Sequence, residues 1–179
     1  MQFGKLPIAL TCGVIAGLAL IVLTTILYLG GVSTFLGSAA YLGYVILIAL
    51  AVVGAQAEKK AHAGFLEFRE ALKVCFLVFV IALLLQTIYS YILMNYINVN
   101  FRQAVEKEVL NRTEKLLRNF GLPQDKIDET LAKESGKNQY TPGKILQGLM
   151  ISYIVSFLVA LVIAAIVKKK RPPFEDAQF

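Results

Sequence analysis

The sequence predicts an all-α membrane protein, a bundle of four transmembrane helices with an extracytoplasmic helical hairpin between the third and fourth. Hydrophobic residues make up 57% of the 179 residues, more than a soluble domain of this size needs. Three long runs contain no charged residue, namely residues 6–57, 74–101 and 145–167. A helix needs roughly 20 apolar residues to cross the hydrocarbon layer. The last two runs therefore supply one span each, and the first supplies two.

The spans are expected at about residues 6–30, 35–57, 72–98 and 142–167, with a turn near Gly30-Gly31-Val32-Ser33 dividing the first run. The apolar part of the first span is far longer than the ~7–15 residues of a signal-peptide core, so we expect an uncleaved anchor. A β-barrel would need strands of ~10 residues that alternate apolar and polar side chains. Residues 157–167 are apolar on every side, which favours helices.

The distribution of basic residues predicts that both termini lie in the cytoplasm. The first connection is uncharged, whereas the second, at residues 58–73, carries four Lys or Arg. The end of the fourth span carries a basic anchor, which we expect to bind anionic lipid headgroups. It consists of Lys168, Lys169, Lys170 and Arg171. The net charge of +6 is assigned to this topology, and no nucleic-acid motif is present.

The insertion at residues 99–141 is predicted to form the extracytoplasmic hairpin. The connection from Arg102 to Lys144 holds nine Lys or Arg, as many as the three cytoplasmic segments together, but they are dispersed rather than adjacent to span ends, so we place it outside. An amphipathic helix ends at Gly121-Leu122-Pro123, a shorter helix covers about 124–134, and Thr141 caps the fourth span. The pattern allows the first of these helices to run straight on from the third span. With few apolar residues, the hairpin should rest on the membrane surface, a second copy or a partner.

The second connection contains aromatic residues at helical spacing, Phe65, Phe68 and Phe76. Either residues 63–72 form an amphipathic stretch along the membrane interface, or they are a connector with anchoring aromatics. We favour the connector.

Small residues at four-residue spacing predict close helix packing, because lipid provides no hydrophobic drive between helices and close backbone approach holds them together. The fourth helix has the longest such stripe, and it serves the internal bundle or, alternatively, a separate subunit. The predicted packing residues are Gly13, Gly17, Ala39, Gly43, Gly148, Ser152, Ser156, Ala160 and Ala164.

Polar residues gather in the outer half of the third span. Gln86 is the deepest, and we expect it to bond another helix, with Gln147 as one candidate partner. The tyrosines suit the aromatic belt at the interface. The alternative is a polar cavity for a ligand, lined by Gln86, Tyr89, Ser90 and Asn95.

Reactive groups for catalysis are scarce. His62 is the only histidine and lies in a basic loop, and Cys12 and Cys75 lie in apolar spans, where packing is their expected role. The sequence therefore predicts no catalytic site, no metal site and no cofactor.

The chain resembles a bacterial membrane family catalogued as domain of unknown function 4199. The elements that carry the resemblance are Phe68-x-x-Ala71, Ile88-Tyr89-Ser90-Tyr91-Ile92, Asn98-Val99-Asn100-Phe101 and the basic end of the fourth span. Members often have proline after that asparagine, where this chain has Val99. The resemblance implies four spans in a bacterial inner membrane and brings no activity and no functional residues.

Two functional hypotheses follow. The first is a non-enzymatic accessory or scaffold subunit that binds a membrane-protein partner or a second copy of itself. The second is a small transporter or lipid-handling protein, with the polar half of the third helix lining a cavity. A membrane enzyme is the weakest hypothesis, because only the carboxylates of the hairpin could serve it.

Overall fold

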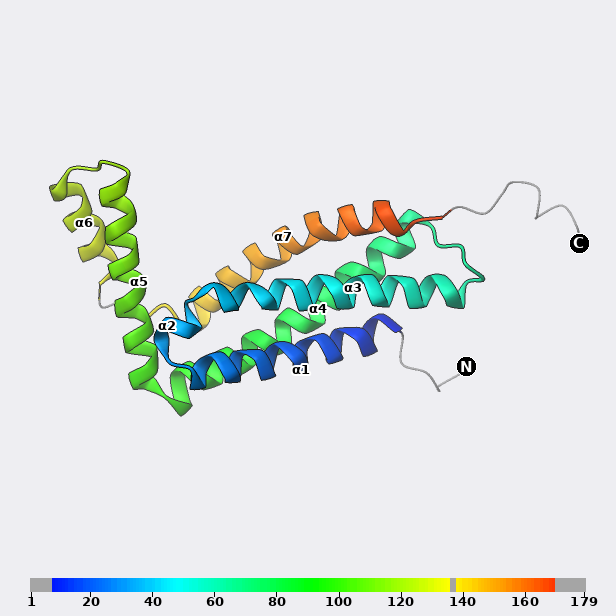
Figure 1. Ribbon diagram of the computed structural model, residues 1–179, viewed down its shortest axis with the longest axis horizontal. Coiled ribbons are helices and arrows are strands. Elements are labelled where there is room, and N and C mark those ends of the chain that lie inside the picture. Colours follow the sequence, from blue (N-terminus) through cyan, green and yellow to red (C-terminus); the bar gives the residue numbers. More distant parts are fainter. Residues whose placement is uncertain (1–7, 136–137, 170–179) are drawn as a thin grey trace, which may run out of the picture.

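The computed structural model describes residues 8–135 and 138–169, which fold into helices joined by short connections (Figure 1). Four of the described helices are long and apolar enough to cross a membrane. They are α1 (Ile8–Leu29), α3 (Leu42–Ala61) with the preceding 3-10 turn η1 (Ser38–Tyr41), α4 (Phe68–Ile92) with the following π-helical turn η2 (Leu93–Ile97), and α7 (Pro142–Val167). The prediction of an all-α chain with four such helices is confirmed.

The second span begins later than predicted. Gly30 and Gly31 end α1, and Gly31 adopts a φ of 84° that favours glycine. A short helix α2 (Val32–Phe35) and the turn η1 come before α3. Ala39 consequently lies in a 3-10 turn and not on the α-helical stripe that would align it with Gly43. A Cβ on Gly43 would lie 3.4 Å from Leu20 Cδ2, so Gly43 packs on α1, and a joint packing role of the pair stays a prediction.

The third span begins earlier than predicted, at Phe68. Positive φ angles at Ala63 and Gly64 turn the chain after α3, and extended Glu67 caps α4. Residues 63–67 therefore form a connector, and no separate amphipathic helix lies there. Of the two interpretations of this segment, the structure favours the connector.

Helix α4 is central to the bundle. It packs most extensively on α1, and also on α7 and α3, whereas α1 and α7 do not contact each other. We call the end where α1 finishes and α7 begins the hairpin end, and the opposite end, where α1 begins and α7 finishes, the tail end (Figure 1). Small side chains at the helix contacts are fully buried, and they allow the helix backbones to approach closely. These are Ala16, Ala51, Ala55, Ala71, Ala82, Ala160 and Ala164.

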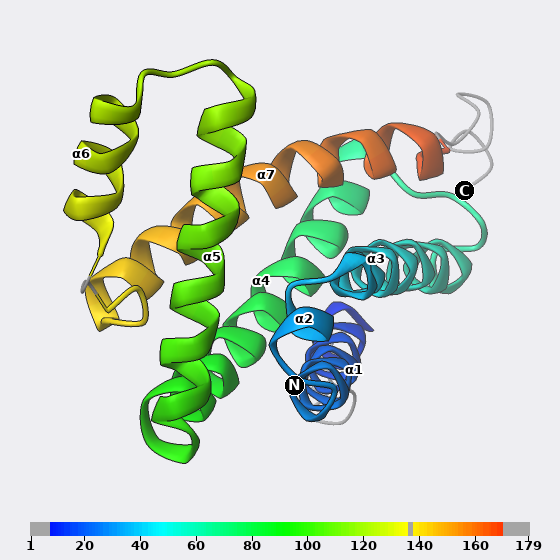
Figure 2. The ribbon, with the colours of Figure 1, turned by 60° about the vertical axis from the view of Figure 1, so that its left-hand side comes forward.

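The hairpin consists of α5 (Val99–Asn119) and α6 (Gln124–Glu134). The third span does not continue into α5, which corrects the alternative of one straight helix. Asn98 leaves the helical region, with φ −145° and ψ 82°, and its side chain accepts a hydrogen bond from Phe101 N. This N-cap starts a new helix in a new direction, and α5 runs across the hairpin end of the bundle (Figures 1 and 2).

Candidate functional site

A network of polar side chains joins the bundle to the hairpin, and Asn95 lies at its centre. The π-helical turn places Asn95 between the end of α4 and the segment before α7. Its Nδ2 donates to the carbonyl oxygens of Tyr91 (3.1 Å) and Tyr140 (2.9 Å). Its Oδ1 accepts from Arg102 Nη1 at 2.8 Å. One side chain thus connects three segments that are distant in sequence.

The Arg102 side chain is mostly buried, with 15% of its surface exposed. Its Nε is 4.0 Å from Glu106 Oε1, a distance that gives an ion pair but no hydrogen bond, so this buried nitrogen has no partner among the described residues. Glu106 in turn accepts a hydrogen bond from the backbone N–H of Gln139 at 3.0 Å. The two charges therefore compensate each other at the base of the hairpin.

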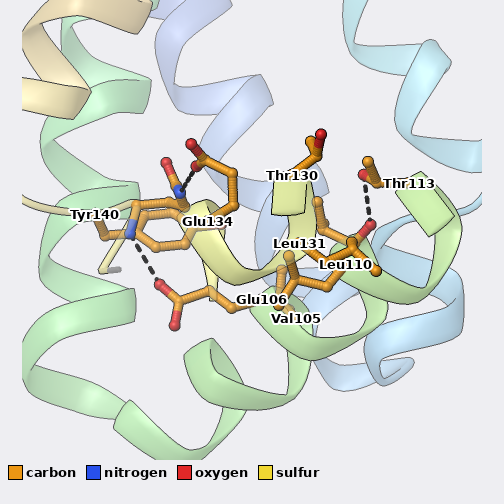
Figure 3. Close-up of a pocket in the computed structure, with 10 residues that line it drawn as sticks. Val105, Glu106, Leu110, Thr113, Thr130, Leu131, Glu134 and Tyr140 are labelled. Atoms are coloured by element: carbon orange, nitrogen blue, oxygen red, sulfur yellow. Dashed lines mark hydrogen bonds between the residues drawn. The ribbon is translucent and has the colours of Figure 1, made fainter. Parts of the chain in front are cut away.

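A pocket of about 360 Å³ lies between α5 and α6, next to this network (Figure 3). Apolar side chains form most of its lining, among them Val105, Val109 and Leu131. Ile127, on α6, is 1% exposed and helps to hold the two helices together.

One end of the pocket is acidic and carries a tyrosine. Figure 3 shows Glu106, Glu134 and Tyr140 together at this end. Glu134 Oε2 accepts from Gln139 Nε2 at 2.9 Å, and this hydrogen bond joins the end of α6 to the segment before α7. Burial raises the pKa of the Tyr140 phenol above its ordinary value of 10, and the negative charge of Glu106 acts in the same direction. Both carboxylates hold partners within the chain, so the apolar walls are the part of the pocket that suits a ligand, namely an apolar group.

A second pocket, of about 290 Å³, opens between α1, α3 and α4 in the hairpin half of the bundle. Thr24, Gln86 and Ser90 are its polar lining residues. Gln86 Nε2 donates to Thr24 Oγ1 at 2.6 Å and to Ser90 Oγ at 3.2 Å, while Gln86 Oε1 is buried with no partner among the described residues. The expected interhelical bond of Gln86 is therefore made to α1, and the suggested partner Gln147 is wrong: it lies exposed on α7.

The four residues predicted to line one polar cavity are not brought together. Gln86 and Ser90 share the second pocket. Tyr89 faces α1 instead, where its hydroxyl is 2.6 Å from Thr25 Oγ1, and Asn95 belongs to the network below the hairpin. Because α4 turns by about 100° per residue, residues 86–95 point around the whole helix. The structure therefore brings together Gln86 and Ser90 of the four residues, and places Tyr89 and Asn95 elsewhere.

The predicted packing residues fall into two groups. A Cβ on Gly13 would lie 2.9 Å from Ile81 Cβ, and one on Gly17 would lie 2.8 Å from Leu85 Cδ1, so these glycines set the α1–α4 distance. On α7, Ser156 and the two alanines beyond it are buried. Gly148 has open space at its Cβ position, and Ser152 is half-buried. The α7 stripe thus packs inside the bundle only in its tail half.

The tail end is closed by contacts that involve two of the four anchor residues. Lys59 Nζ donates to the carbonyl oxygen of Val167 at 2.8 Å, at the C-terminus of α7 where a cation is favourable. Leu66 and Lys169 exchange two backbone hydrogen bonds, of 2.9 and 2.8 Å. Lys168 Nζ lies 5.7 Å from the centre of the Phe68 ring. Lys170 and Arg171 lie outside the described residues.

Sequence reasoning missed the network and the Gly54 contact. A Cβ on Gly54 would lie 3.4 Å from both Cys12 Cβ and Val78 Cγ2. Gly54 has no small residue four positions before or after it, so the four-residue spacing does not mark it. Ala51 and Ala55, which lie close to it in the sequence, do have this spacing and were a usable signal. Nothing in the local pattern around Asn95 and Arg102 shows that residues 138–140 return to this end of the bundle.

Comparisons with known proteins identify a family without an assigned activity. No curated protein and no solved structure matches the chain significantly. The model of one family, described as "Protein of unknown function (DUF4199)", matches residues 11–169. This match runs from the first turn of α1 through α7 and includes the hairpin, and the chain therefore belongs to this family of proteins of unknown function.

Proposed function

We propose that the protein is a multi-pass protein of the bacterial inner membrane that acts as a non-enzymatic accessory or scaffold subunit of a membrane complex. In this proposal both termini lie in the cytoplasm and the hairpin lies outside. The basic residues at the tail end support this orientation, because Lys and Arg beside span ends favour the cytoplasm. They include Lys59, Lys60, Lys168 and Lys169 among the described residues.

The pocket between α5 and α6 is the observation on which the subunit role depends. The hairpin is held to the bundle at both sides of its base, so the pocket has a fixed position relative to the membrane. A partner that reaches it contributes an apolar side chain to the wall formed by Val105, Val109 and Leu131. The partner is a neighbouring membrane protein or a second copy of the chain.

A photocrosslinker at the pocket mouth tests the subunit role. Thr130 lines the pocket and is exposed, whereas Ala132 is an exposed residue of the same helix that does not line it. A crosslinking residue at Thr130 should capture one stoichiometric companion in native membranes, and one at Ala132 should not. In mild detergent, Thr130→Phe should release that companion while Ala132→Phe retains it. A monomer that is purified without a companion, or equal crosslinking from both positions, would refute the proposal.

The pocket in the hairpin half of the bundle favours lipid handling as a second function. It shares Tyr44, Leu47 and Leu83 with a further pocket of about 290 Å³ that lies between α3, α4 and α7. Together they form an apolar path along α3 with an amide at one end. A photoactivatable lipid analogue should label residues along this path, and Gly43→Leu should reduce the labelling. Labelling equal to that of the lipid-exposed Ile166 would exclude a dedicated lipid site.

A further inference from the structure

The level of α5 relative to the membrane follows from the tyrosines at the hairpin end. Tyr41, Tyr44 and Tyr96 are 69%, 63% and 71% exposed around the outside of the bundle. Exposed tyrosines on spanning helices lie at the headgroup level, where the ring is in apolar surroundings and the hydroxyl is hydrated. Asn98, two residues after Tyr96, begins α5, so this helix starts at the headgroup level.

Contacts along α5 keep it at that level. Near its start, Asn98 Nδ2 donates to the Tyr28 hydroxyl at 2.9 Å, and the Phe101 ring lies 4.8 Å from that of Tyr28. Arg112, roughly 21 Å further along at 1.5 Å per residue, donates to the Leu36 carbonyl oxygen at 2.6 Å. Tyr28 and Leu36 both lie at the hairpin end of the bundle. A helix tied to that end at two distant points runs parallel to the membrane surface.

Beyond Arg112, α5 projects past the bundle, and α6 lies on its side away from the bundle (Figure 1). We call this part of the hairpin, residues 113–122, the overhang, and Figure 2 shows it from a second direction. The side of α5 that faces the bundle near Leu36 therefore faces the lipid surface in the overhang. At about 100° per residue, Leu116 lies about 40° around the helix from Arg112, and Asn119 about 20°. Both are on this side.

The overhang carries apolar residues that no other described segment covers. Leu116 is 56% exposed, Phe120 is 77% exposed and Leu122 is 36% exposed. Lys115 and Arg118 lie beside them, and their long side chains can reach a phosphate layer while their stems remain on apolar surface. Bulky apolar residues flanked by basic ones, on a helix parallel to the membrane, are typical of interfacial helices.

We propose that the overhang of α5, residues 113–122, is a membrane-surface anchor that inserts Leu116 and Phe120 into the lipid leaflet at the hairpin end. The lipid takes the place of a protein partner on this face. The anchor fixes the hairpin, and the pocket that it carries, at a constant height above the bilayer. This inference requires only that the bundle spans the membrane, and it holds whichever side the hairpin occupies.

Depth-dependent fluorescence quenching in proteoliposomes tests the anchor. The full-length chain with Cys12→Ala and Cys75→Ala receives one cysteine at Asn119, which keeps both proposed anchor residues, and an environment-sensitive fluorophore. Ala132→Cys on α6 serves as the aqueous control and Ile154→Cys, which is 64% exposed on α7, as the lipid control. Vesicles contain phosphatidylcholine and phosphatidylglycerol, with a spin label near the top of the acyl chain.

The fluorophore at position 119 should be quenched by the spin-labelled lipid several-fold more strongly than the one at position 132. The double change Leu116→Ser and Phe120→Ser should abolish this difference while the lipid control keeps its signal, which shows that the bundle is still inserted. Strong quenching at position 119 by aqueous iodide would overturn the proposal. Protection from both quenchers would also overturn it, because a protein surface would then cover the face.

Discussion

The two halves of the bundle are held together in different ways. In the tail half, alanines with no exposed surface bring α1, α3, α4 and α7 into close contact, and the large side chains Val78 and Phe79 fill the space that remains. In the hairpin half, hydrogen bonds join the helices, from Gln86 to Thr24, between Tyr89 and Thr25, and from Asn98 to Tyr28. Both kinds of contact are effective in lipid, because lipid neither competes for hydrogen bonds nor fills the gaps between helix backbones.

This difference separates a rigid half from an adaptable half. Close packing of small residues leaves one arrangement of lowest energy, whereas polar side chains with several partners tolerate rearrangement. Of the two bundle pockets described above, the one between α1, α3 and α4 lies in the hairpin half, and the one between α3, α4 and α7 extends from Tyr44 to Phe79 and Val159.

The largest effect is expected from Gly13→Leu. Its Cβ would lie 2.9 Å from Ile81 Cβ, an atom that cannot move without α4, so the α1–α4 contact must open. The free energy of unfolding should fall by about 3 kcal/mol, measured by titration with sodium dodecyl sulfate in mixed micelles. Gly148→Leu makes the same change where nothing lies within 4 Å, and it should have almost no effect. Equal losses of unfolding free energy in the two variants would contradict the interpretation that close helix packing holds the tail half together.

A moderate and local effect is expected from Asn98→Ala. The change removes the N-cap of α5 and the hydrogen bond to Tyr28, which should destabilise the hairpin by about 1 kcal/mol. Hydrogen exchange of the first turns of α5 should accelerate, while exchange in the tail half stays as it was. Asn98→Asp keeps the acceptor for the Phe101 N–H and serves as the control. Acceleration throughout the bundle would mean that the two halves unfold as one unit.

A smaller effect is expected from Gln86→Leu. This change removes the 2.6 Å bond to Thr24 but also removes a buried oxygen that has no partner among the described residues. Interhelical hydrogen bonds in membranes contribute about 0.6 kcal/mol on average. The change in the free energy of unfolding caused by Gln86→Leu should therefore be smaller than the destabilisation expected from Asn98→Ala. The detergent titration used for Gly13→Leu measures it. A loss as large as that of Gly13→Leu would show that hydrogen bonding, and not packing, dominates the hairpin half.

The smallest effect appears only at high pH. The folded state raises the pKa of Tyr140 above 10, so the neutral phenol is favoured there. Stability from this group is fully present below the unfolded pKa and is lost as the pH rises through the folded pKa. Proteolysis of the hairpin by an alkaline protease should therefore accelerate above pH about 10. Tyr140→Phe should remove that acceleration and leave cleavage at neutral pH unchanged; a variant with the native profile would show that another group titrates.

Local pattern was a good guide where one helix decided the outcome. Thr141 and Pro142 correctly marked the start of α7, and Gly121-Leu122-Pro123 the end of α5. Ion pairs form between Glu108 and Arg112 and between Glu114 and Arg118, because spacing of four residues on one helix is sufficient to form them. Local pattern was a poor guide to Asn95, because its partners Arg102 and Tyr140 come from segments that are distant in the sequence.

The sequence by itself determined that the chain is helical, that four helices have the length and composition of spans, and where most of them begin and end. These properties depend on backbone hydrogen bonding and on the thickness of a bilayer, which a run of residues must satisfy alone. Only the tertiary structure decided that α5 turns across the bundle, that Arg102 is buried against Asn95, and that a pocket opens between α5 and α6. Such features arise from contacts between residues far apart in the chain, such as Asn95 with Tyr140 and Arg112 with Leu36, and no local pattern records them.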